Sequence, residues 1–198
     1  MATTSRIGSA GRCPPSPPIS LPLGLDEQGI VAKVQLGEGV GLELKPFIDL
    51  SSGKAPELVR TAMAFANTEG GEIVVGVSDD LTISGIDVDV MRHSQKPAPP
   101  PSECIEKYRG AVVAAIKDRV VPSIDVEAVP VRIRDRTVLV VRVPKGDGPP
   151  RYDVHERRVY VRRGANNMLA DPASDLPRLY SGTPLAAWEA AGLFRPQR

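Results

Sequence analysis

Apolar and polar residues alternate through the segment VGLELKPFIDL, residues 40–50. Val40, Leu42 and Leu44 fall on one side of an extended chain, and Glu43 and Lys45 fall on the other. A period of two residues is typical of a strand that buries one face. The pattern therefore predicts a half-buried strand.

A helical spacing of apolar residues follows in SSGKAPELVRTAMAFANTEGG, residues 51–71. The predicted apolar face consists of Leu58, Met63, Phe65 and Ala66. Gly70 and Gly71 come just after this face, where the end of a helix often requires a positive φ. The segment therefore predicts a helix that ends before the two glycines.

The next segments predict two strands and a second long helix. EIVVGVS, residues 72–78, is a β-branched run of strand length, which predicts a strand buried on both faces. DDLTISGID, residues 79–87, predicts a turn into a short partner strand. ECIEKYRGAVVAAIKDRV, residues 103–120, has helical spacing, and Pro122 ends this helix.

The last third of the chain is expected to contain mostly strands. Residues 124–133 and 137–144 predict two adjacent strands, and residues 151–165 predict a hairpin with its turn near Glu156. Asn166 is expected to cap a helix, and the apolar segment PLAAWEAAGLF, residues 184–194, predicts a terminal helix.

This order of elements indicates an α+β fold with a mixed, mostly antiparallel sheet and two main helices, which we expect on one face of the sheet. The first 27 residues are rich in proline and serine and predict a disordered tail. Residues 28–180 form the predicted domain, and residues 181–198 form a C-terminal helix and tail.

Composition narrows the class of protein. The chain has 198 residues, of which 41% are hydrophobic and 25% are charged, which suits one domain of ordinary size. No apolar run approaches the ~20 residues that a membrane-spanning helix needs. Cys13 and Cys104 have neither metal-ligand spacing nor the context of a structural disulfide. We expect a soluble, cytoplasmic protein that does not contact a membrane.

Charge is divided unevenly along the chain. Residues 38–107 contain twelve acidic and six basic residues, whereas residues 130–165 contain ten basic and four acidic ones. Such an asymmetry is typical of a protein in which one part meets an anion. It is equally consistent with solvated strand faces that neutralise each other.

Two kinds of enzyme find little support in the sequence. The glycines of GEGVG, residues 37–41, precede a strand and lack the pattern of an ATP-binding phosphate loop. His93 and His155 are far apart in the sequence, and no G-x-S-x-G motif is present. We therefore expect neither ATP hydrolysis nor catalysis by a serine or cysteine nucleophile.

Several carboxylates could meet at one edge of the sheet. Glu43 and Lys45 share a strand face, and Glu38 lies five residues before Glu43. Asp79 and Asp80 come at the end of the predicted strand at residues 72–78. Clustered carboxylates bind Mg²⁺ or Mn²⁺, which can activate water, and a lysine can stabilise developing charge. The alternative is a surface Glu–Lys pair beside a hairpin turn.

Arginines interleaved with a tyrosine mark the segment RRVYVRRGANN, residues 157–167. Arg158, Tyr160 and Arg162 would share one strand face, with Arg163 opposite. Side chains of this kind are suited to contact phosphate groups. The residues predicted to bind nucleic acid are Arg151, Arg158, Tyr160, Arg162, Arg163 and Asn166. An ordinary exposed strand face would have the same pattern.

Several of these motifs together resemble the Schlafen/AlbA-type DNA-binding domain, a family also described as divergent AAA-type ATPases or helicase-like transcriptional regulators. The motifs are LELK, AFANTEGGEIVVGVSDD, ISGID, VLVVRVP and VYVRRGANN, and the resemblance covers residues 36–169. Its signature turn corresponds to Asn67, Thr68, Gly70 and Gly71.

The resemblance implies nucleic-acid binding, in many members as part of a bacterial regulator of transcription. Vertebrate Schlafen proteins with this domain cleave tRNA and rRNA, and their metal site corresponds here to Glu38, Glu43, Lys45 and Asp79 or Asp80. They use a pair of such domains, so the resemblance also implies that a homodimer could complete a cleft.

Three hypotheses follow from the sequence. The first is a nucleic-acid-binding regulatory protein with DNA or RNA as its partner. The second is an endoribonuclease that depends on Mg²⁺ or Mn²⁺ and acts on structured RNA such as tRNA. The third is a protein-interaction domain, indicated by the proline-rich tail and the apolar segment LAAWEAAGLF.

Overall fold

The computed structural model describes residues 26–53, 55–94 and 101–181. The first part of the chain contains α1 (Glu27–Leu36), β1 (Leu42–Lys45), the short 3-10 helix η1 (Leu50–Ser52), α2 (Ala55–Ala66), β2 (Gly71–Val75), α3 (Asp87–Arg92) and α4 (Pro101–Lys117). The second part contains β3 (Val120–Val121), β4 (Glu127–Ile133), β5 (Arg136–Val143), β6 (Tyr152–Asp153), β7 (Tyr160–Arg163), β8 (Asn166–Leu169) and α5 (Asp175–Tyr180).

Four strands form the central sheet in the order β1-β2-β5-β4. β1 and β2 are parallel, with α2 as the crossover between them, and the β2–β5 and β4–β5 pairs are antiparallel. β3 pairs with β6, and β7 pairs with β8, in two smaller sheets. The predicted α+β fold with a mixed, mostly antiparallel sheet is confirmed.

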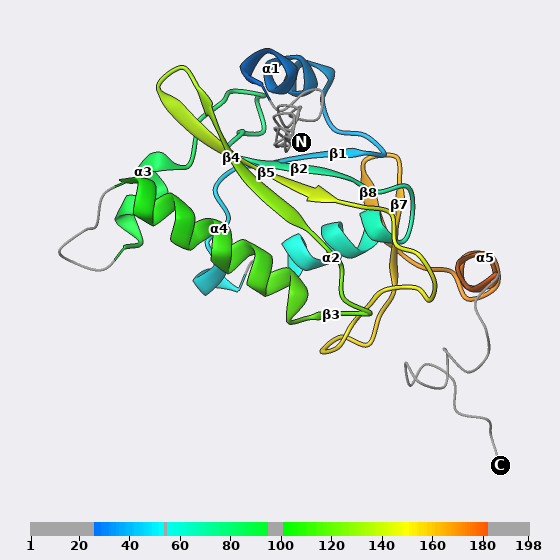
Figure 1. Cartoon of the computed structure of the whole chain (residues 1–198). Coiled ribbons are helices and arrows are strands. Elements are labelled where there is room, and N and C mark those ends of the chain that lie inside the picture. The colour runs from blue at the N-terminus through cyan, green and yellow to red at the C-terminus, as the bar shows by residue number, and fades with distance from the viewer. Residues whose placement is uncertain (1–25, 54, 95–100, 182–198) are drawn as a thin grey trace, which may run out of the picture.

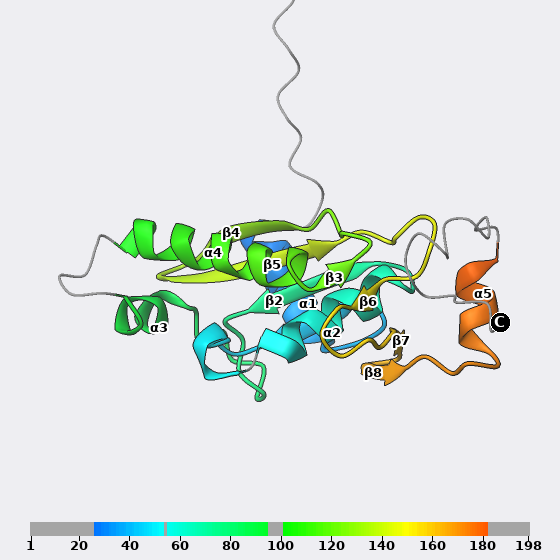
Figure 2. The ribbon, with the colours of Figure 1, turned by 90° about the horizontal axis from the view of Figure 1, so that it is seen from below.

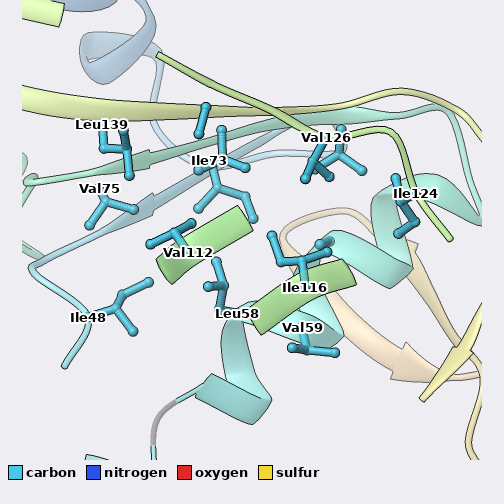
Figure 3. Close-up of a cluster of buried hydrophobic side chains, with 14 of the residues drawn as sticks. Ile48, Leu58, Val59, Ile73, Val75, Val112, Ile116, Ile124, Val126 and Leu139 are labelled. Carbon is cyan, nitrogen blue, oxygen red and sulfur yellow. The ribbon is translucent and has the colours of Figure 1, made fainter. Parts of the chain in front are cut away.

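The central sheet is buried on both faces (Figures 1 and 2). Side chains of β2 alternate between the two cores, so that Ile73 and Val75 contact the core under α2 and α4, while Val74 contacts the core under α1. Figure 3 shows the larger core, where Val112 and Ile116 of α4 lie close to sheet residues. The prediction of a β2 strand buried on both faces is correct.

The two main helices, α2 and α4, contact the same core, whereas the helix α1, which the sequence did not predict, covers the other face of the sheet. The buried positions of α1 are Ile30 and Val34, four residues apart, and Val31 is partly buried against the same core. So short an apolar stripe does not reveal a helix until the sheet it covers is known.

Two further local predictions differ from the structure, and two others fall on residues that it does not describe. The expected short strand after residue 79 is a single bridge between Val77 and Ile83, and α3 follows it. Asn166 begins strand β8 instead of a helix, because Gly164, with φ 59°, turns the chain back onto β7. The predicted terminal helix at residues 184–194 and the N-terminal tail up to residue 25 lie outside the described residues.

No helix in residues 26–53, 55–94 and 101–181 combines the length and the apolar character needed to cross a membrane.

Candidate nucleic-acid interface

Lys45 lies between two carboxylates at the edge of the central sheet. Its Nζ is 2.9 Å from Oε1 of Glu43 and 3.0 Å from Oε1 of Glu57. Burial alone would lower the pKa of Lys45, but the hydrogen bonds to Glu43 and Glu57 outweigh burial and raise it. Lys45 is therefore a firmly protonated cation, and Glu57, in the first turn of α2, is a member of the cluster that the sequence reasoning missed.

Glu43 is buried against Arg162. Nη2 of Arg162 lies 2.6 Å from Oε2 of Glu43, and their side chains are 0% and 5% exposed. The same Nη2 donates to the carbonyl oxygens of Gly39 and Leu42, so its contact with Oε2 is ionic and not an aligned hydrogen bond. The guanidinium also stacks 5.0 Å from the ring centre of Phe65.

The burial of Arg162 shows that its predicted contact with nucleic acid was wrong. Tyr160 needs the same correction, because it is 8% exposed and its hydroxyl donates to Glu156 at 3.1 Å. β7 packs on α2, so the strand face that carries both residues turns inward and not toward solvent. The alternation of side chains along a strand correctly predicted that Tyr160 and Arg162 share one face, but it could not predict which face is buried.

The remaining predicted acids, Glu38, Asp79 and Asp80, do not form a metal-binding group with Glu43 in the described part of the chain. Glu38 accepts the Leu44 N–H at 3.1 Å, and Asp80 accepts the Thr82 N–H at 3.0 Å in an exposed turn. Glu38, Lys45 and Asp79 do line one surface hollow of about 390 Å³. The structure therefore brings these three side chains to one hollow, whereas Glu43 is buried and does not line it.

This arrangement does not fit a divalent metal ion. In the described part of the chain, no group of three His, Cys, Asp or Glu side chains is placed to hold one. Two cations, Arg162 and Lys45, already compensate the Glu43 carboxylate within 2.9 Å. A Mg²⁺ or Mn²⁺ ion would have to displace these cations, because it needs its oxygen ligands free.

The two glycines of the signature turn are explained by close packing. Gly70 has φ 77°, and a Cβ at this position would lie 2.8 Å from the backbone N of Lys145 and the O of Val143. A Cβ at Gly71 would lie 2.8 Å from the ring of Phe65. Larger residues would therefore force the start of β2 away from its neighbours.

Asn67 and Thr68 of the same turn bind the chain on either side of residues 153–158. Asn67 Nδ2 donates to the carbonyls of Arg151 and Tyr160 at 2.8 and 2.9 Å, and the Arg151 N–H donates to Asn67 Oδ1 at 2.7 Å. Thr68 Oγ1 accepts the Arg162 N–H at 2.9 Å. These contacts give the signature turn a structural role: it fixes a distant segment to the end of α2.

That segment contains a turn held by several hydrogen bonds, residues 153–158, which we call the basic turn. Asp153 is fully buried; its Oδ1 accepts the N–H groups of His155 and Glu156, and its Oδ2 accepts from Arg119 at 2.6 Å. Arg60 of α2 donates to Glu156 at 2.6 Å. This hydrogen bond is the main reason that the pKa of Glu156 is lowered.

The basic turn exposes two arginines. Arg157 and Arg158 are both solvent-exposed, and neither forms an ion pair with a described carboxylate. Arg157 has φ 54°, a conformation held by its N–H bond to the Asp153 carbonyl at 2.7 Å. Arg158 was among the predicted residues, whereas Arg157 was missed, because its positive φ places it outside the strand pattern.

The other predicted basic residues have different surroundings. Arg163 Nη2 donates to both carboxylate oxygens of Asp175, at 2.9 and 2.8 Å, so its charge is largely neutralised. Asn166 is exposed at the start of β8. Arg151 is half-buried and donates to the carbonyls of Asp147 and Pro149.

Comparison with known proteins gives one strong match. A family model described as Schlafen, AlbA_2 matches residues 38–171. No curated protein matches the chain.

Solved structures of similar shape include the DIP2311 protein from Corynebacterium diphtheriae, at 20% identity and a TM-score of 0.45, with 67% of this chain and 22% of that chain covered. They also include the N-terminal domain of a RecG-related protein from Nitrosomonas europaea, at 18% identity and a TM-score of 0.46, with 70% and 88% covered. The chain therefore spans under a quarter of the first protein and most of the second domain.

Proposed function

The chain belongs to the Schlafen AlbA_2 family, and we propose that it binds nucleic acid through the basic turn. The observation that carries this proposal is the pair of exposed arginines, Arg157 and Arg158, which no described carboxylate neutralises. Arginine is well suited to such contacts because its planar guanidinium donates two parallel hydrogen bonds to a phosphate.

The hydrogen bonds that hold the basic turn support this role. The two acids of the turn, Asp153 and Glu156, are committed to Arg119 and Arg60. The turn therefore keeps its shape without using the charges of Arg157 and Arg158. Less side-chain and loop ordering is then needed when a nucleic acid binds, which favours affinity.

Binding through phosphate groups should depend strongly on salt. Each phosphate contact contributes about 0.9 to the slope of log K against log salt for duplex DNA and about 0.7 for single strands. A double variant, Arg157→Gln with Arg158→Gln, should weaken binding and reduce this slope by about 1.8 for duplex DNA. Fluorescence anisotropy of labelled duplex DNA and of structured RNA over a salt series measures both quantities.

Arg134→Gln is a matched control for this experiment. Arg134 has the same φ of 54° as Arg157, and its side chain is 88% exposed, with only a 4.0 Å contact to Glu27. It lies in the turn between β4 and β5, far from β7 (Figure 1). The control should leave affinity and slope nearly unchanged. Equal losses in the control and the double variant, or an unchanged slope in the double variant, would count against the basic turn.

The endoribonuclease hypothesis retains one supporting observation, the hollow shared by Glu38, Lys45 and Asp79. The neutralised Glu43 argues against a metal ion, so we assign no metal to this hollow. Asp79→Asn is the suitable test, because Asp79 is exposed and the change should leave the fold intact. Cleavage of tRNA in the presence of Mn²⁺ that disappears in this variant would revive the hypothesis. A homodimer remains a prediction that sedimentation can test.

A further inference from the structure

A hollow of about 300 Å³ lies where the end of α2, the segment after β5 and helix α5 come together. In Figure 1 that segment passes between the end of α2 and α5. Three cationic side chains line the hollow, from Lys145, Arg151 and Arg178, beside a single carboxylate from Glu69. We call it the Lys145 pocket. Its lining charges leave an excess of two positive charges.

Arg151 is the most constrained of the three cations. Its Nη1 donates to the carbonyls of Asp147 and Pro149, and its Nε is buried without a partner. A Cβ on Gly146 would collide with the guanidinium, so the glycine leaves room for it. Burial lowers the pKa of Arg151, although the nearby Asp147 charge acts in the opposite direction. The pocket is thus shaped around a cation that lacks a paired carboxylate.

Lys145 and Arg178 are held only loosely. Lys145 lies 3.1 Å from Glu69, and both side chains are more than half exposed. Arg178 lies 3.8 Å from Asp175, whose carboxylate is already bound by Arg163 at 2.8 Å. Exposed pairs of this kind contribute little to stability. Both side chains can therefore turn toward a ligand at little cost.

The cations of the pocket are not required to cap α2. The last carbonyls of this helix already accept from Asn67 N, Thr68 Oγ1, Gly70 N and Gly146 N. The negative end of the helix dipole favours cations nearby, which helps to explain why they gather there. Because the carbonyls are satisfied, the cationic groups keep donors for another partner.

We infer that the Lys145 pocket binds a phosphomonoester, namely the terminal phosphate of a nucleic-acid strand; this identification of the ligand rests on the proposed function. A phosphomonoester carries a charge of about −1.5 to −2 at pH 7 and three strong acceptor oxygens. Its charge matches the excess in the pocket, and its oxygens match the three cationic donors. An internal phosphodiester carries only a single charge, so a strand end fits better.

Two arms of one experiment test this inference on the whole chain. In the first arm, inorganic phosphate is titrated into the protein while NMR follows the amides of Gly146 and Gly148. In the second arm, oligonucleotides of one sequence with a 5′-phosphate, a 3′-phosphate or only hydroxyl ends compete for binding. We expect the Gly146 and Gly148 signals to shift, and one phosphorylated end to bind about ten-fold more tightly than the hydroxyl form.

Arg178→Gln is the diagnostic variant, because Arg178 is exposed and makes no close contact that the fold needs. It should abolish most of the preference for the phosphorylated end, and Lys145→Gln should act in the same way, while Arg134→Gln should not. Equal affinity for phosphorylated and hydroxyl ends, or a preference that survives both variants, overturns the inference. A third outcome separates the two proposals. If no oligonucleotide binds, the proposed function and the strand-end ligand are both refuted. If inorganic phosphate still shifts the Gly146 and Gly148 signals, and these shifts vanish in Arg178→Gln, the pocket binds only free phosphate.

Discussion

Arg162 and Glu43 form a buried ion pair that joins strand β7 to strand β1, with Nη2 2.6 Å from Oε2. The two residues are 119 positions apart in the sequence, and neither side chain is exposed by more than 5%. Removing one member of such a pair leaves a buried charge without its partner, which costs about 3–5 kcal/mol. The pair therefore acts as a structural connection and not as part of the binding surface.

Arg162→Leu should lower the free energy of unfolding by about 3–5 kcal/mol, since Glu43 would keep only Lys45 as a partner. Arg158→Leu is the control on the neighbouring segment, because Arg158 is exposed and forms no ion pair with a described carboxylate; it should change stability by less than about 0.5 kcal/mol. Urea denaturation measures both. A loss below about 1 kcal/mol in Arg162→Leu would contradict the structural role.

Asn67→Ala should destabilise the fold by about 1–3 kcal/mol, because it leaves the Arg151 N–H and the carbonyls of Arg151 and Tyr160 without this partner. Asn166→Ala removes the same side chain from an exposed position and should change stability by less than about 0.5 kcal/mol. Thermal unfolding of both variants provides the comparison. If Asn67→Ala and Asn166→Ala have the same melting temperature, the signature turn does not hold the basic turn in place.

Replacing glycine by alanine should change the free energy of unfolding in opposite directions at two positions. Gly70→Ala should destabilise by more than about 1 kcal/mol, because φ is 77° and the new Cβ would meet backbone atoms at 2.8 Å. Gly110→Ala, within α4, places its Cβ in open space and should stabilise by about 0.5–1 kcal/mol. Stabilisation by both, measured in urea, would show that the turn tolerates a side chain.

Stability should fall in acid partly through Glu156. The hydrogen bond from Arg60 holds the folded-state pKa of Glu156 below its ordinary value of 4.5. Its contribution is therefore present above the unfolded pKa and is lost as pH falls through the lower folded pKa. Glu156→Gln should be less stable than the parent near neutral pH, and the difference should shrink in acid.

Denaturation at a series of pH values measures this difference. Arg60→Gln should flatten the same part of the curve, because Arg60 is the main cause of the lowered pKa. If the difference in free energy of unfolding between the parent and Glu156→Gln stays constant down to low pH, Glu156 does not contribute to the loss of stability in acid.

Local patterns predicted most of the elements and several side-chain relations. Alternation placed Glu43 and Lys45 on one strand face, and their side chains do meet at 2.9 Å. The pair Gly70-Gly71 marked the end of α2 correctly. These features depend on backbone geometry within a few residues, which the chain encodes locally.

The tertiary structure alone decided which polar residues are buried. The alternation of side chains along a strand allows Arg162 to face either solvent or α2. Which of these two faces is buried depends on Glu43, which is distant in the sequence. The same holds for Glu57, which reaches Lys45 from the crossover helix, and for Arg178, which lines one hollow with Lys145 and Arg151 although it comes from a different element. The sequence by itself thus determined most of the strands and helices and the family of this protein, because those signals are local. The division of its charges between core and surface required the packed fold, since burial of a charge depends on partners that only folding brings together.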